Sequence, residues 1–172
     1  MKKPLILFAM LLAACGMAAS DDAANLRADA EWMCKAVEEG DADAIVEHTY
    51  PGLLEKIGGP DEMRKIVLAG QTDMRQRGLA VQSVEITAVS EPLQAGSELH
   101  AVVRTKRTVK GPTGRQIINS YVIAVSGDAG DNWTFVDGQK LTPAHVLALF
   151  PDFNVDLVLP SPSQPVFERD PS

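Results

Sequence analysis

The spacing of the apolar residues changes at residue 79, and this change limits the fold class of the 172-residue chain. Up to Gly78 the apolar residues recur every three or four positions, as on one face of a helix. Beyond it they alternate with polar residues, as on one face of a strand. Helices followed by strands, without interleaving, are typical of an α+β domain with helices on one face of an antiparallel sheet.

Four helical segments are expected before the change, over residues 21–39, 41–49, 53–57 and 60–78. Capping and helix-breaking residues define where these segments begin and end. Asp41 is a favourable N-cap, and Pro60 occupies the first helical position, which proline favours. Gly78 is a typical residue at which a helix ends.

About four strands are expected after the change, over residues 79–88, 98–109, 115–126 and 133–137. Their links are short and rich in turn-forming residues, which indicates hairpins in an antiparallel meander. Because long hairpins twist, we expect the sheet to curve strongly around the first helix. Thr142 and Pro143 predict a last short helix that extends to residue 150. Prolines are frequent in residues 151–172, which predicts an extended tail that is partly docked on the domain.

The amino terminus has the three parts of an export signal. Lys2 and Lys3 form a positive region, residues 4–12 form an apolar run, and small residues continue through Ser20. The apolar run is too short to span a bilayer as a stable helix. An ordinary secretory signal cut after Ala18 or Ser20 would give a soluble periplasmic or secreted protein.

A second interpretation of the same segment comes from Leu-Ala-Ala-Cys at residues 12–15, which resembles the lipobox of bacterial lipoproteins. The resemblance implies that residues 1–14 are removed and that Cys15 carries the lipid, with residues 15–21 as a short linker. The protein would then be anchored to a membrane of the cell envelope and face the periplasm. We prefer this interpretation because the cysteine falls directly at the end of the apolar run.

Charge and cysteine content exclude two further possibilities. The net charge of −7 becomes −9 when the two lysines of the signal are removed, and an acidic domain repels nucleic acid. With Cys15 lipidated or removed, Cys34 is the remaining thiol, so no disulfide is expected within the domain. We expect Cys34 to be a buried, unreactive thiol.

Besides the order of the elements, three local stretches carry a family pattern, at residues 32–40, 49–51 and 132–138, and two more follow them at residues 149–153 and 164–167. Together they resemble the nuclear transport factor 2-like superfamily, also described as SnoaL-like or as a cystatin-like cone. The resemblance implies that residues 22–150 form a cone-shaped domain with a cavity, as in uncharacterised exported members. It does not fix the function, because this fold includes isomerases, dehydratases, transport factors and domains without known activity.

An enzyme of this fold would place an acid inside the cone next to a hydrogen-bond donor. Glu85 and Asp137 are the candidate acids on strands, but no motif fixes their geometry, so no catalytic residue is assigned. The three histidines lack ligand spacing, so neither a metal nor a cofactor is expected. The candidate cavity-lining residues are Trp32, Tyr50, His100, Tyr121 and Asp137.

Two charged segments have two interpretations each. Residues 128–132 resemble part of a calcium loop, but a hairpin turn explains every residue in them. The second hairpin is basic, which fits a solvated strand face or, alternatively, contact with an acidic partner or an anionic ligand. Its basic residues are Arg104, Lys106, Arg107, Lys110 and Arg115.

Three functions therefore remain. The first is a non-catalytic envelope domain that binds a small apolar molecule or a protein partner. The second is an enzyme of the isomerase or dehydratase type that uses an acid in the cone. The third is an interaction module that forms homodimers through the outer face of its sheet. The missing catalytic motif favours the first.

Overall fold

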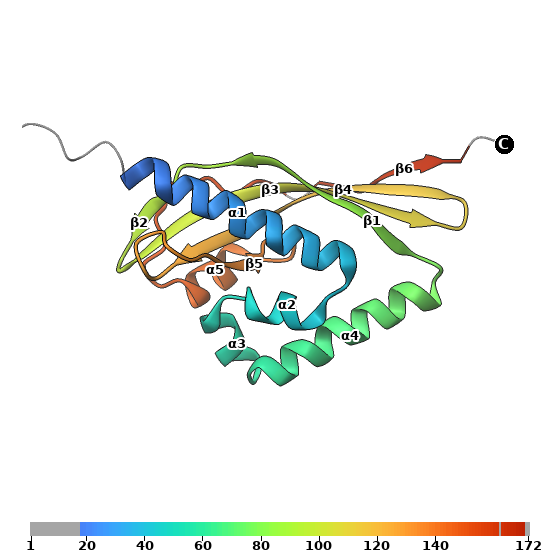
Figure 1. The fold of residues 1–172 in the computed structure, drawn as a ribbon, viewed down its shortest axis with the longest axis horizontal. Helices are drawn as coiled ribbons and strands as arrows, with labels where there is room; N and C mark the ends of the chain where they lie inside the picture. The colour runs from blue at the N-terminus through green and yellow to red at the C-terminus, as the bar shows by residue number, and fades with distance from the viewer. Residues whose placement is uncertain (1–17, 162, 171–172) are drawn as a thin grey trace, which may run out of the picture.

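The computed structural model describes residues 18–161 and 163–170, with side chains from residue 21. The expected export signal and the lipidation of Cys15 lie outside the described residues. Within them, no helix is both long and apolar enough to cross a bilayer. The chain forms an α+β domain in which four helices precede an antiparallel sheet, as the change in apolar spacing predicts (Figure 1).

The helical half comprises α1 (Ala18–Glu39), α2 (Ala42–Glu47), α3 (Pro51–Ile57) and α4 (Pro60–Gln76). Gly40 ends α1 with a φ of +72°, which glycine adopts without strain. Asp41 caps α2 by accepting hydrogen bonds from the backbone N–H groups of Asp43 and Ala44. Helix α3 begins two residues earlier than expected, because Pro51 takes the first helical position.

The sheet has six strands, two more than expected: β1 (Ala80–Val89), β2 (Leu93–Ala95), β3 (Glu98–Gly111), β4 (Gly114–Ser126), β5 (Thr134–Asp137) and β6 (Val166–Arg169). The main order is β1-β3-β4-β5, and all pairs are antiparallel. Strand β2 adds to β3, and β6 adds to β4 from the C-terminal tail. Both were missed because three or four residues are too few to show a two-residue period.

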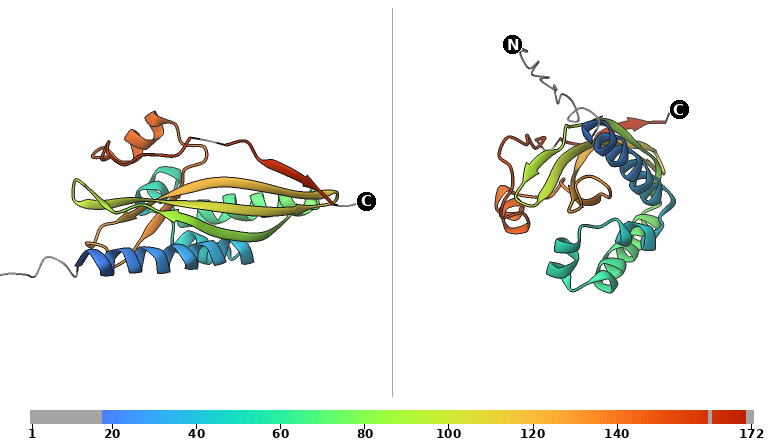
Figure 2. Two further views of the ribbon diagram at one scale, coloured as in Figure 1. Left: turned by 90° about the horizontal axis from the view of Figure 1, so that it is seen from above. Right: turned by 60° about the vertical axis from the view of Figure 1, so that its left-hand side comes forward.

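The two faces of the sheet are covered by different segments. Helix α1 lies on one face, where Leu26 and Ala30 pack on Val103, Trp133 and Phe135. The other face is covered by α5 (Pro143–Leu149) and the residues that follow it (Figure 2, left). There the side chains of β3 and β4 pack against the following segment through Val102, Tyr121, Ile123, Val125, Val146, Phe150 and Leu157.

The loop between β4 and β5 is a turn that is held by hydrogen bonds among its own residues. The Asp128 carboxylate accepts hydrogen bonds from the Ser126 hydroxyl and from the backbone and side-chain N–H groups of Asn132. These bonds lower the pKa of Asp128 from 3.8 to about 2. The Trp133 N–H donates to Asp29 of α1, which ties the start of β5 to the helix. The turn interpretation of residues 128–132 is thus confirmed.

Candidate functional site

A cavity of about 380 Å³ lies between the four N-terminal helices and the sheet. Each of these helices contributes apolar side chains to its wall, and strands β1, β3, β4 and β5 close the other side. Among the apolar lining residues are Val37, Ile45, Leu53, Val67, Val103 and Val122. A pocket of this size with a mainly apolar wall is typical of small-molecule sites.

A few polar groups reach this wall. The Thr49 hydroxyl donates to the backbone oxygen of Ile45 and is thereby satisfied. The Cys34 thiol is buried, which together with the charges of Glu31 and Glu38 raises its pKa from 9.0 to about 11. This thiol is therefore protonated and a poor nucleophile at neutral pH.

Three further polar residues line the cavity: Thr105, Arg107 and Ser120. The first and the last face each other across β3 and β4. The guanidinium Nε of Arg107 is buried and has no hydrogen-bond partner among the described residues. These three side chains form a polar group in a mainly apolar wall.

The structure places Asp137 at this cavity, where its carboxylate accepts a hydrogen bond from the Gln139 N–H. Tyr121 lies on the opposite face of the sheet, beneath α5, with its ring against Gly138. Burial, together with the charge of Asp137, raises the pKa of Tyr121, but the two form no hydrogen bond. Trp32 is 45% exposed and contacts the His48 ring in a tilted arrangement, with ring centroids 4.2 Å apart.

Tyr50 and His100 meet at a different place, through an acid that the sequence did not single out. The Tyr50 hydroxyl donates to one Glu98 oxygen at 3.1 Å, and His100 Nε2 lies 3.0 Å from the other. Burial and the Glu98 contact raise the pKa of Tyr50 to about 12. Because Glu98 and His100 are two residues apart on one strand, alternation alone places them on one face.

The Tyr50–Glu98–His100 cluster is closed on the His100 side. The imidazole is 1% exposed and contacts the rings of Phe150 and Phe153 at centroid distances of 4.9 and 5.9 Å. Its Nδ1 is buried without a hydrogen-bond partner among the described residues. Ring packing on this side leaves no space for a substrate at the imidazole, so the cluster ties α3 and the tail to β3.

The acid and donor that an isomerase or dehydratase would need are not paired at the cavity. Glu85, the other candidate acid, is exposed and pairs with Lys106 at 2.8 Å. Asp137 forms no hydrogen bond with a tyrosine or a histidine in residues 21–161 and 163–170. Over the same residues, no group of three or more potential metal ligands occurs.

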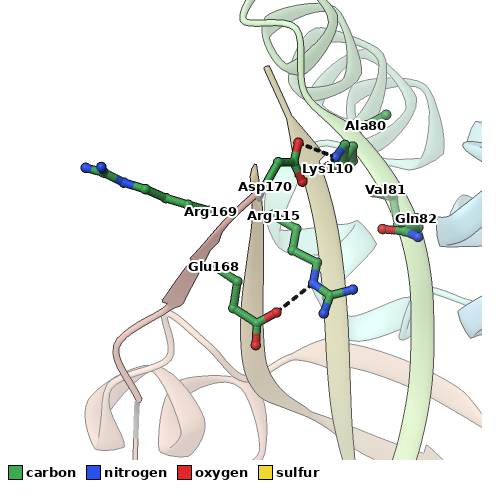
Figure 3. A pocket seen from close by; sticks show the side chains of 8 residues that line it. All are labelled: Ala80, Val81, Gln82, Lys110, Arg115, Glu168, Arg169 and Asp170. Atoms are coloured by element: carbon green, nitrogen blue, oxygen red, sulfur yellow. Dashed lines mark hydrogen bonds and ion pairs between the residues drawn. The ribbon is translucent and has the colours of Figure 1, made fainter. Parts of the chain in front are cut away.

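A larger hollow, of about 570 Å³, lies between β1 and β6 at the far end of the sheet (Figure 3). Its charged groups largely neutralise one another, since Lys110 pairs with Asp170 and Arg115 with Glu168, both at 2.7 Å. The side chain of Arg169 points away from it (Figure 3). This hollow is therefore the weaker candidate for a ligand.

In comparisons with known proteins, no family model matches the chain, and no curated protein matches it.

Proposed function

We propose that this protein is a cell-envelope lipoprotein whose domain, a cone of the nuclear transport factor 2-like type, binds a small apolar molecule without transforming it. The observation that carries this proposal is the cavity of about 380 Å³ beneath α1, α2, α3 and α4. Its volume falls within the roughly 300–1,000 Å³ that is usual for ligand pockets. Helix α1 and the sequence order of the elements support the cone.

The wall of the cavity favours binding over catalysis. The thiol of Cys34 is protonated, and the carboxylate of Asp137 has no tyrosine or histidine partner in the described part of the chain. Pairing of two copies through the outer sheet face is disfavoured, because α5 and the residues after it already cover much of that face.

Binding of decanol tests the proposal, since this neutral probe has an apolar chain of suitable size. We expect calorimetry to show binding that is lost in Val122→Trp, which fills the cavity. Val155→Trp is the matched control, because Val155 is 86% exposed and lies outside the cavity wall. The same affinity in Val122→Trp, or no binding in the unchanged protein, would overturn the proposal.

The anchor has its own test. Replacement Cys15→Ala removes the residue that would carry the lipid, so the protein should move from the membrane fraction to the soluble fraction. If the variant still sediments with membranes, the lipoprotein part of the proposal is wrong. Cys34→Ala is the matched control and should remain in the membrane fraction.

A further inference from the structure

Arg107 brings a guanidinium group to the wall of the cavity. Strand β3 pairs with β4 without interruption from Leu99 to Gly111, so its side chains alternate regularly. Val103, Thr105 and Arg107 therefore follow one another on the helix-covered face, and all three line the cavity. The positive charge of Arg107 thus belongs to the cavity rather than to the opposite face of the hairpin.

The other basic residues of the hairpin are neutralised or hydrated. Lys106, Lys110 and Arg115 each form an ion pair with a carboxylate at 2.7–2.8 Å. Arg104 lies on the opposite face and is exposed, so water solvates it. The Arg107 side chain is half-buried, and its guanidinium group has neither an ion pair nor a hydrogen bond to any residue that the structure describes.

An acidic side chain does lie nearby but does not neutralise Arg107. The Glu38 carboxylate accepts a hydrogen bond from the backbone N–H of Val84. Val84 is the direct partner of Arg107 in the β1–β3 register, so Glu38 lies near Arg107. Glu38 forms no ion pair with Arg107. The guanidinium group is therefore left without an acceptor from the described part of the chain.

Two hydroxyl groups lie beside this charge on the same wall. Thr105 and Ser120 are direct partners in the β3–β4 register, and both line the cavity. Within the described residues, neither side chain donates a hydrogen bond to another group. The cavity wall thus offers a cation and two hydroxyl donors that face the same space.

The guanidinium group of Arg107 and the hydroxyl groups of Thr105 and Ser120 are all donors, and no negatively charged acceptor from the described residues pairs with them. Charged groups in apolar surroundings are normally paired, and a buried donor without an acceptor is unfavourable. Because arginine binds carboxylates through two parallel hydrogen bonds, a carboxylate on the occupant would complete the set. Most of the remaining wall is apolar and would contact an apolar chain, apart from Cys34, Thr49 and the charged Asp137.

We infer that the occupant is an amphipathic monoanion, an apolar chain ending in a carboxylate, which is held by Arg107, Thr105 and Ser120. The inference rests on the proposed function and names the ligand class for the same cavity. At roughly 30 Å³ per water-sized group, the volume of about 380 Å³ holds about a dozen non-hydrogen atoms. Decanoate has about this size.

The second charge in the wall sets the direction of the ligand. Asp137 pairs with Val122, which pairs with Val103, four residues before Arg107 on β3. At about 3.3 Å per residue, Arg107 therefore lies ~13 Å along the strand from the position level with Asp137. The carboxylate of the ligand is therefore placed at Arg107, away from the negative charge of Asp137.

Calorimetry with decanoate and decanol tests the inference. We expect decanoate to bind about tenfold to a hundredfold more tightly, as hydrogen bonds to a charged group imply. Arg107→Gln should remove this preference but keep decanol binding, and Arg107→Lys should retain part of it. Arg104→Gln is the matched control, because it removes the same charge from the opposite face of the same strand.

The outcomes separate the two proposals. Equal binding of decanoate and decanol, or a decanoate preference that survives in Arg107→Gln, overturns the inference and leaves the apolar site standing. If neither decanoate nor decanol binds, the proposed function and the inference are both overturned. If Arg107→Gln does not fold, the affinity ratio in the unchanged protein and in Arg107→Lys still decides.

Discussion

The thiol of Cys34 reports on the cavity, and its reactivity can be predicted from its surroundings. Burial in the cavity wall is the main reason why its pKa rises from 9.0 to about 11, and the charges of Glu31 and Glu38 add to the rise. Only the thiolate reacts with alkylating reagents. We therefore predict that iodoacetamide modifies Cys34 slowly and that the rate increases with a midpoint near pH 11.

The size of the effect follows from the two pKa values. Near pH 8, a thiol with a pKa of 9.0 is roughly one-tenth ionised, and one with a pKa of about 11 is roughly one-thousandth ionised. Folded Cys34 should therefore react about a hundredfold more slowly than the same residue in the unfolded chain. Because Cys34 is only 9% exposed, limited contact with the reagent slows the reaction further.

The same shift predicts a loss of stability at alkaline pH. As the pH rises, the unfolded chain releases the Cys34 proton first, so the contribution is complete below about pH 9 and is lost as the pH approaches about 11. Two pKa units correspond to about 3 kcal/mol. Cys34→Ala should lack this contribution to the free energy of unfolding, whereas the loss of stability that Tyr50 causes above about pH 10 should remain.

Peptide-resolved mass spectrometry measures this reactivity, because it separates Cys34 from Cys15. The rate is followed from neutral to alkaline pH in the folded protein and in urea, where the midpoint should return to the ordinary value. Saturating decanol should slow the reaction of the folded protein still more. A folded-state midpoint near 9, or equal folded and unfolded rates, would refute the burial argument.

Further predictions concern the core, the turn and the tail. Leu26→Ala should lower the free energy of unfolding by about 2–5 kcal/mol, and exposed Leu147→Ala by less than about 0.5 kcal/mol, in urea titrations. Asp128→Ala should destabilise the protein above about pH 4, where the carboxylate is charged in both states, and this difference should disappear as the pH falls towards about 2. Phe150→Ala should make the chain after α5 sensitive to limited proteolysis, because this buried ring holds it on the sheet.

The helices could be predicted from the sequence because their ends depend on local chemistry. The N-cap side chain of Asp41 and the prolines at the starts of α4 and α5 act within one turn of the chain. At α5, the Thr142 hydroxyl accepts from the His145 N–H while His145 accepts from the Thr142 N–H. Such signals involve residues at most three positions apart, so they can be recognised in the sequence alone.

The missed strands depend on distant partners instead. Strand β6 exists because it pairs with residues 114–117 of β4, about fifty positions earlier in the chain. Nothing in its four residues distinguishes it from the extended tail around it. Strand β2 likewise forms by pairing with the start of β3. Short strands of this kind have no intrinsic pattern and require the sheet that receives them.

Alternation was sufficient to group residues by face but not to say what covers each face. Tyr121 alternates in phase with Ile123 and Val125, and the three residues do pack together beneath α5, yet helices α1, α2, α3 and α4 enclose the cavity on the other face. Which side receives α1 is decided by long-range packing, such as the contact between Leu26 and Trp133. The cavity lining therefore could not be assigned from strand register alone.

Arg107 shows why the charge pattern and the site are different kinds of information. In the sequence it is one of five basic residues on a hairpin, and such a cluster is ordinarily a solvated surface. In the structure, three of the five have carboxylate partners and Arg104 is exposed. What distinguishes Arg107 is its position on the helix-covered face and its buried, unpaired Nε, and both properties exist only once helices and sheet enclose it. The functional signal is therefore the missing partner rather than the charge itself.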